Sequence, residues 1–146
     1  MAIVTAPASV ETITRLRLVV MRLSRLLRQQ SADELSPTLT STLSTVERRG
    51  PLTLGELAAA ERVQPPSMTR AVARLEERGL VTRVVDPVDR RTARVSISPA
   101  GAKTLAAGRL RKNAYLADRM RTLGSDERVL LERALPLLER LVGDQL

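Results

Sequence analysis

The sequence has no cysteine and no histidine, and these absences exclude whole classes of site. Without cysteine the chain can form no disulfide and cannot sense oxidants through a thiol. Without histidine it has no histidine-based metal site or catalytic dyad. It also has no glycine-rich phosphate-binding loop, and its carboxylates are scattered as helix caps and ion-pair partners. We therefore expect no metal, no cofactor and no enzymatic activity.

Aromatic residues and long apolar runs are also scarce. Tyr115 is the one aromatic residue, so Leu, Val and Ala must fill the core, which suits packed helices. No apolar run approaches the ~20 residues that a membrane-spanning helix needs. The start of the chain, MAIVTAPASVE, lacks the basic region and the apolar core of a signal peptide. These features predict a cytoplasmic location and no membrane partner.

Positive charge is abundant. The net charge is +8, and 22 of the 24 basic residues are arginine. A basic balance favours a polyanion partner such as nucleic acid, and arginine suits bidentate contacts to phosphate and guanine. A GC-rich genome would also raise the arginine content, but it would not explain where the arginines lie.

Apolar spacing and helix-capping residues predict a mainly α-helical chain, residues 1–146, with a winged helix-turn-helix and its two-stranded β wing in the middle. Helices over 9–32 and 98–146 flank a module over 33–97. Ser9 and Ser36 are expected to cap the first two helices, and Gly50 to end the second. The apolar faces of the first and last helices are wide enough to indicate packing against another subunit. The residues expected there are Ile13, Leu16, Val20, Leu131, Leu135, Leu138 and Leu141.

Inside the module, Thr53 and Glu56 fit a capping box that begins a short helix. The next helix should run from Pro65 to Arg78 and end at Gly79 in the left-handed conformation. Strands are expected over 81–85 and 92–97, joined by a turn over 86–89. A helix should follow from Ser98-Pro99 to about residue 123, and Ser125 should cap the last one.

The helix from Pro65 to Arg78 has the chemistry of a recognition helix. A core face is expected from Met68, Ala71, Val72 and Leu75. The start of such a helix enters the major groove, where arginine can bind guanine and hydroxyl groups can reach bases or phosphates. Unpaired N–H groups at the helix start would suit a phosphate. The candidate DNA-binding residues here are Ser67, Thr69, Arg70 and Arg74; alternatively, the arginines only pair with Glu76 and Glu77 or face solvent.

The hairpin tip, DPVDRRTAR, is the second candidate DNA contact. A narrow tip lets one arginine enter a minor groove, whose potential attracts cations. Phosphates would repel Asp89, so we expect Asp89 to orient an arginine, Arg90 or Arg91, by a charge-assisted hydrogen bond. The alternative is a solvated turn whose charges keep the edge strands soluble.

These segments together resemble the MarR family of bacterial transcriptional regulators. The similar segments are GPLTLGELA (50–58), MTRAVARLEERGLVTR (68–83), DPVDRR (86–91) and VSISPAG (95–101). The resemblance implies an obligate homodimer, formed by the first and last helices, that binds a palindromic operator on double-stranded DNA, usually as a repressor. It implies that Arg91 enters the minor groove, that Asp89 holds it and that Arg90 lies near phosphate. It also implies that Thr53 contacts phosphate.

The chain departs from the family pattern in two places. Gln64 stands where many members have a serine N-cap, and Pro65-Pro66 removes two N–H donors, so base contacts near Gln64 and Pro65 are altered. Other members bind aromatic effectors between the dimerisation region and the winged module. A pocket for a small effector in this chain would be lined by aliphatic side chains and arginine, with Arg17, Met21 and Leu43 as candidates.

Three functions are therefore compatible with the sequence. A sequence-specific dimeric regulator, bound to DNA in the nucleoid, agrees with the base-reading residues and with the wing. A non-specific architectural DNA-binding protein would share the charge but would need no base readout. A protein–protein module would use the arginines only as surface charge.

Overall fold

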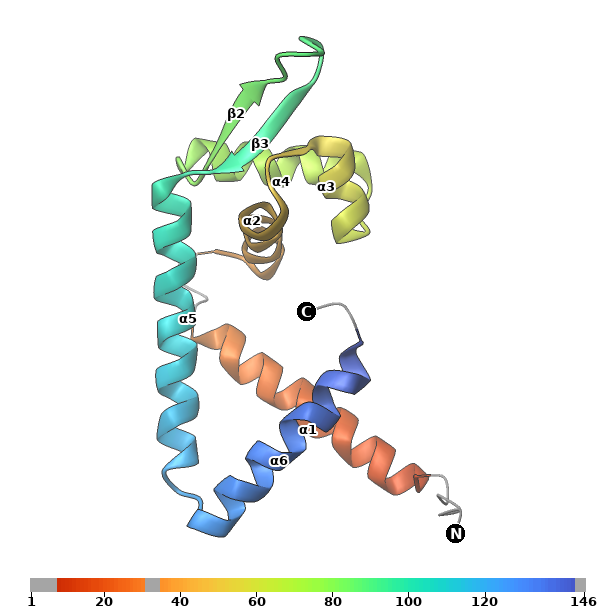
Figure 1. The fold of residues 1–146 in the computed structure, drawn as a ribbon, viewed down its shortest axis with the longest axis vertical. Helices are drawn as coiled ribbons and strands as arrows, with labels where there is room; N and C mark the ends of the chain where they lie inside the picture. Colours follow the sequence, from red (N-terminus) through yellow and green to blue (C-terminus); the bar gives the residue numbers. More distant parts are fainter. Residues whose placement is uncertain (1–7, 31–34, 144–146) are drawn as a thin grey trace. The chain divides into compact units, whose positions relative to one another are not determined.

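The computed structural model describes residues 8–30 and 35–143, and these form six helices and three short strands (Figure 1). Their order is α1 (Val10–Gln29), α2 (Pro37–Arg49), β1 (Leu52–Thr53), α3 (Leu54–Glu61), α4 (Pro65–Glu77), β2 (Val81–Val85), β3 (Ala93–Ile97), α5 (Pro99–Met120) and α6 (Ser125–Val142). The predicted fold class, mainly helical with a winged helix-turn-helix between terminal helices, is confirmed. Residues 31–34 and 144–146 of the predicted ranges lie outside the described residues.

The chain divides into two compact units, Met1–Lys112 and Asn113–Leu146. The first unit holds α1 to α4, the sheet and most of α5, and the second holds the end of α5 and α6. Every residue predicted to contact DNA lies in the first unit. The predicted division into a 33–97 module and flanking dimerisation helices stays a prediction.

Side chains cap α1 and α2 where the sequence predicts them, but not α6. The Ser9 hydroxyl accepts from Thr12 N at 3.1 Å, and the Ser36 hydroxyl accepts from Leu39 N at 3.4 Å. The prediction that Ser125 caps α6 is wrong, because Gly124 is the N-cap and Ser125 is the first helical residue. The Glu127 carboxylate accepts from Gly124 N at 2.8 Å. This contact satisfies one of the N–H groups at the helix start without a capping side chain.

The sheet has three antiparallel strands in the order β1-β3-β2. Strand β2 pairs with β3 from Val81↔Ile97 to Val85↔Ala93, so β3 starts one residue later than expected. Strand β1 adds only the pairs Leu52↔Val95 and Thr53↔Arg94. A two-residue strand carries no alternating pattern, which is why the sequence did not predict β1. The sheet is therefore three-stranded at its base, and only β2 and β3 form the wing.

The core of the first unit lies between α2, α3, α4 and the base of the sheet. Leu43, Leu57, Val72, Leu75 and Val95 have no exposed surface. The predicted core face of α4 is confirmed, since Met68, Ala71, Val72 and Leu75 are all buried. Burial of such side chains contributes about 1.5–3 kcal/mol each, which makes this core the main support of the module.

Glu61, at the end of α3, joins this helix to α2. Its carboxylate accepts from the Ser41 hydroxyl at 2.6 Å and from the Thr45 hydroxyl at 2.5 Å. Thr45 is buried, so its hydroxyl needs an acceptor inside the protein. Glu61 therefore fixes the distance between α2 and α3.

The end of α4 and the start of α5 meet at a tight junction. Gly79 has φ of +68°, the left-handed conformation predicted for it, and Leu80 N donates back to Leu75 O at 2.9 Å. The Ser98 hydroxyl donates to Gly79 O at 2.6 Å and accepts from Gly101 N at 3.0 Å. A Cβ on Gly101 would lie 2.1 Å from Leu80 O, so only glycine fits. The first turn of α5 thus packs directly on the α4–β2 junction.

Helices α1 and α6 have no buried residue among those described. Of the side chains predicted for dimerisation, six are exposed and Leu138 is intermediate; the exposed ones are Ile13, Leu16, Val20, Leu131, Leu135 and Leu141. Their apolar surface is available for a partner. None of the described helices is both long enough and apolar enough to span a membrane.

Candidate nucleic-acid interface

The residues predicted to read bases lie together at the start of α4. Ser67, Thr69, Arg70 and Arg74 are exposed, while the neighbouring face of the helix is buried. Two of these side chains fold back on the first turn: the Thr69 hydroxyl donates to Pro65 O at 3.0 Å, and Arg70 Nε donates to Pro66 O at 3.4 Å. This contact uses only Nε of Arg70, and the two terminal nitrogens of a guanidinium are the groups that can bind a guanine edge.

The backbone at the start of α4 differs from the expectation. Gln64 is the N-cap, its side chain makes no capping bond, and Pro65 and Pro66 have no N–H. The next two amides, Ser67 N and Met68 N, both donate to Gln64 O, at 3.0 and 3.2 Å. Residues 65–68 therefore leave no unpaired N–H group for a phosphate. We therefore expect the DNA contacts at the start of α4 to come from side chains.

Thr53 begins α3 at the second expected phosphate contact. The predicted capping box is confirmed: Glu56 N donates to Thr53 Oγ1 at 3.1 Å, and Thr53 N donates to Glu56 Oε2 at 2.8 Å. The hydroxyl oxygen thus accepts from a backbone N–H at the helix start. The backbone N–H of Thr53, followed by its side chain and the charge of Arg94, lowers the pKa of Glu56 below its usual value.

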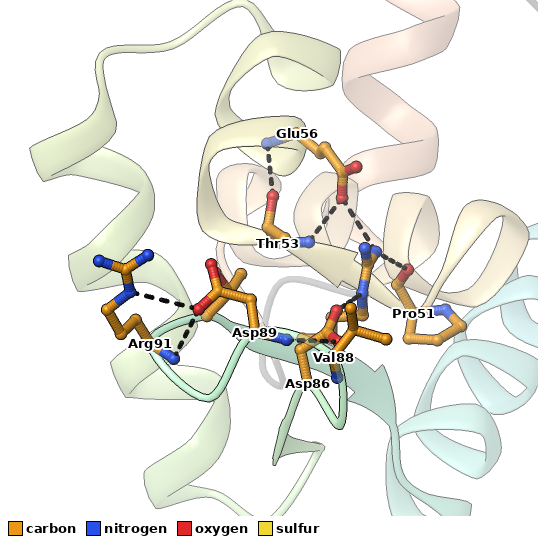
Figure 2. Close-up of polar contacts among 9 residues, drawn as sticks. Pro51, Thr53, Glu56, Asp86, Val88, Asp89 and Arg91 are labelled. Carbon is orange, nitrogen blue, oxygen red and sulfur yellow. Dashed lines mark hydrogen bonds and ion pairs between the residues drawn. The ribbon is translucent and has the colours of Figure 1, made fainter.

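The wing tip presents its arginines to solvent. Asp89 Oδ1 accepts from the backbone N–H of Arg91 at 3.0 Å and from its Nε at 3.4 Å (Figure 2). Arg90 is exposed next to this pair. The Asp89–Arg91 pair that the sequence predicts is therefore formed, and the terminal guanidinium nitrogens of Arg91 remain able to enter a groove.

A second set of charged contacts lies behind the tip and was not predicted. Asp86 Oδ1 accepts from Val88 N at 2.8 Å, and Asp86 Oδ2 accepts from Arg94 Nε at 2.8 Å (Figure 2). Arg94, and then the backbone N–H groups of Val88 and Asp89, lower the pKa of Asp86. Asp86, and then the charge of Glu56, raise the pKa of Arg94. One signal for this set is visible in the sequence, an aspartate at the start of the turn, but nothing in the spacing pairs it with Arg94.

The predicted effector residues do not form a common site. Leu43 is fully buried in the core, so it offers no surface to a ligand, and its assignment is corrected to a core residue. Arg17 and Met21 are exposed on α1, where Arg17 Nη1 lies 3.8 Å from Met21 Sδ.

A different cavity of about 460 Å³ lies between the end of α1 and α2. Its described lining has four basic side chains and no acidic one; the basic residues are Arg25, Arg28, Arg48 and Lys112. Four hydroxyl groups line it as well, those of Ser36, Thr40, Ser41 and Ser44.

Comparisons with known proteins agree with this arrangement. Residues 35–93 match the model of the MarR family. An uncharacterized HTH-type transcriptional regulator of Mycobacterium bovis is 42% identical over 130 residues, which cover 88% of this chain and 91% of that protein. A crystal structure of a putative transcriptional regulator from Pseudomonas aeruginosa has a TM-score of 0.85 at 32% identity and covers 94% of this chain and 98% of that one.

A mutant of MepR from Staphylococcus aureus, solved bound to an oligodeoxyribonucleotide, has a TM-score of 0.71 at 18% identity. The match covers 86% of this chain and 93% of that one. At this level of identity it shows only that the two proteins share a fold. The matched segment contains the helix-turn-helix and most of the wing, and the more similar relatives span nearly the whole chain. This chain therefore belongs to the MarR family.

Proposed function

We propose that this protein is a homodimeric transcriptional repressor that binds a palindromic DNA operator. The observation that carries the proposal is that one compact module exposes both the start of α4, with Arg70, and a wing tip with Arg91. The first suits a major groove and the second suits a minor groove. MepR, which shares the fold, was solved bound to an oligodeoxyribonucleotide. Repression is the usual mode of the family, and the nucleoid of a bacterial cytoplasm is the place where it acts.

Two modules in a dimer would contact half-sites about 34 Å apart on one face of the duplex. The exposed apolar side chains of α1, and separately those of α6, support this assembly, because a large exposed apolar patch marks an interface. Sedimentation tests it: the wild-type chain should be a dimer, and Leu135→Glu on α6 should shift it to a monomer. Val84→Glu, on the exposed wing, is the matched control and should stay dimeric. A monomeric wild-type chain would contradict the proposal.

DNA selectivity separates this function from a non-specific architectural role. A regulator should bind its own upstream region at least ~10³-fold more tightly than random DNA of equal length. Equal affinity for both would favour the architectural alternative, and no shift with either would favour a protein–protein module. The measurement is repeated at two salt concentrations, since each neutralised phosphate adds nearly one unit to the slope of log affinity against log salt.

A small anionic effector that releases the DNA is part of the proposal. The cavity by α2 has the size of a ligand site and combines positive charge with aliphatic and hydroxyl groups. Decanoate, a carboxylate with an aliphatic tail, is the first probe, and decanol is its uncharged control. We expect decanoate alone to raise the unfolding temperature and to weaken operator binding, and Arg48→Gln to abolish both effects. Identical responses to both compounds would contradict an anion site.

A further inference from the structure

Arg94 lies at the centre of a continuous chain of polar contacts between the start of α3 and the wing tip. Its Nε donates to Asp86 Oδ2 at 2.8 Å. Its Nη1 lies 3.4 Å from Glu56 Oε2 and 3.5 Å from the carbonyl oxygen of Pro51. One side chain on β3 therefore contacts the turn of the wing, the first turn of α3 and the segment before β1.

From Asp86 the contacts continue to the tip. Asp86 Oδ1 accepts from the backbone N–H groups of Val88 and Asp89, at 2.8 and 3.4 Å. Asp89 in turn holds the backbone N–H and the Nε of Arg91. The position of the Arg91 guanidinium therefore depends on Asp86, and the position of Asp86 depends on Arg94.

The sheet shows why such a tie matters at this place. Strand β1 ends at the pair Thr53↔Arg94, and beyond this pair β2 and β3 have no third strand beside them in the described sheet. An isolated two-stranded ribbon is marginally stable in water. Arg94 thus stands at the point where the supported sheet becomes a free ribbon, and its side chain reaches both parts.

We propose that Arg94 is a positioning residue, which ties the wing turn to the first turn of α3 and thereby fixes where Arg91 meets DNA. The inference rests on the proposed DNA-binding function. It assigns a role in DNA binding to a residue of β3 that lies outside the wing tip. A binding residue needs supporting contacts that hold it near its working position before the ligand arrives. The competing role for Arg94 is a direct phosphate contact, which the test below separates from positioning.

The first measurement uses the free protein and does not depend on DNA binding. In Arg94→Gln, the ¹⁵N order parameters of Val88 and Arg91 should fall from about 0.85, typical of a rigid backbone, towards or below about 0.6. Arg83→Gln is the matched control, because Arg83 also makes a wing ion pair, to Glu76 at 2.9 Å, that lies outside the chain leading to Arg91. It should leave these order parameters unchanged. Equal rigidity of the tip in Arg94→Gln and in the wild type would overturn the proposal.

The second measurement is a double-mutant cycle of operator affinity with Arg91→Ala. Coupled residues show non-additive effects, and independent residues show additive ones. We expect Arg94→Gln alone to weaken binding by about tenfold, and to cost less than about twofold once Arg91 is already alanine. Arg94→Lys should keep the charge but not the affinity, since one ammonium group cannot replace separate donors to Asp86 and Glu56. Thermal unfolding checks that each variant is folded.

The results separate the possibilities. Multiplicative losses in the double variant, or full rescue by Arg94→Lys, would mean that Arg94 contacts phosphate directly, and the positioning role would be wrong. If the wild-type protein selects no operator, the proposed function fails, while the order parameters still decide whether Arg94 holds the wing tip.

Discussion

Asp89 accepts two hydrogen bonds from Arg91, yet the Arg91 side chain remains 93% exposed. The carboxylate orients the guanidinium without covering it. An exposed ion pair of this kind contributes little to stability, so we expect it to act mainly by placing a charge before the DNA arrives.

Arg91→Ala should therefore weaken operator binding by about 1–3 kcal/mol, the range for the loss of one good groove contact, while the fold survives. Fluorescence anisotropy with labelled operator measures the loss, and circular dichroism checks the fold. Arg90→Ala is the matched control: it should weaken binding to all sequences alike and lower the salt slope by about one. A folded Arg91→Ala dimer with full operator affinity would contradict the wing assignment.

Arg70→Ala should change specificity as well as affinity. A bidentate contact between arginine and guanine discriminates by about 1–3 kcal/mol against the wrong base, and alanine removes it. Binding to a set of single-base operator variants should show relaxed preference at one position in each half-site. If the variant still ranks these operators as the wild type does, Arg70 reads no base.

Glu61→Ala should destabilise the module, since it removes the acceptor of the buried Thr45 hydroxyl. A buried polar group without a partner costs about 1–3 kcal/mol. Urea unfolding measures the difference. Glu77→Ala, an exposed change on α4, is the control and should lie within about 0.5 kcal/mol of the wild type. Equal stability of the two variants would mean that Glu61 does not tie α2 to α3.

Gly101→Ala should destabilise the fold by about 1–3 kcal/mol, as expected for an overpacked site, because the added Cβ meets Leu80 O. The control is Gly55→Ala near the start of α3, where the nearest atom would be Thr53 Oγ1 at 4.0 Å. Alanine favours a helix over glycine by up to about 1 kcal/mol, so Gly55→Ala should be neutral or stabilising. Thermal unfolding of both variants decides the matter, and a stable Gly101→Ala would contradict the tight junction.

The wing network predicts a dependence on acid pH. Arg94, together with backbone N–H groups, lowers the pKa of Asp86 below its usual 3.8 in the folded protein. The unfolded chain then binds more protons in this range, so the stabilisation is present above the usual pKa and is lost as pH falls through the lowered one. In Asp86→Asn, which cannot titrate, the stability deficit relative to the wild type should shrink between about pH 6 and pH 3. A deficit that stays constant over this range would contradict the Asp86–Arg94 pair.

The sequence predicted most of the module because its signals are local. Ser9, Ser36, Thr53 and Gly79 cap or end their helices within a few residues, and the α4 core face follows from helical spacing. The Asp89–Arg91 contact spans two residues and was predicted as well.

Long-range pairings were missed. Arg94 and Glu56 are 38 residues apart in the sequence, and the paired residues of β1 and β3 are separated by a similar number. Contacts between such distant residues produce no periodic pattern in the sequence. The ligand pocket was misjudged for a related reason. Leu43 is an aliphatic residue of the kind that lines pockets. Its complete burial depends on the packing of the surrounding helices, which the sequence does not reveal.

The contacts of Gly79, Ser98 and Gly101 couple the position of α5 to the position of α4. Ser98, which directly precedes α5, donates to Gly79 O just after the end of α4 and also accepts from Gly101 N in the first turn of α5, so we expect a rotation of one helix to move the other. Helix α4 has 13 residues and is about 20 Å long, so a tilt of about 5° at this pivot moves its reading end by nearly 2 Å. A displacement of about 1 Å is enough to move binding side chains out of contact geometry with their ligand. A change in the packing of this junction is therefore expected to alter DNA affinity, although Gly79, Ser98 and Gly101 are not among the residues predicted to contact DNA.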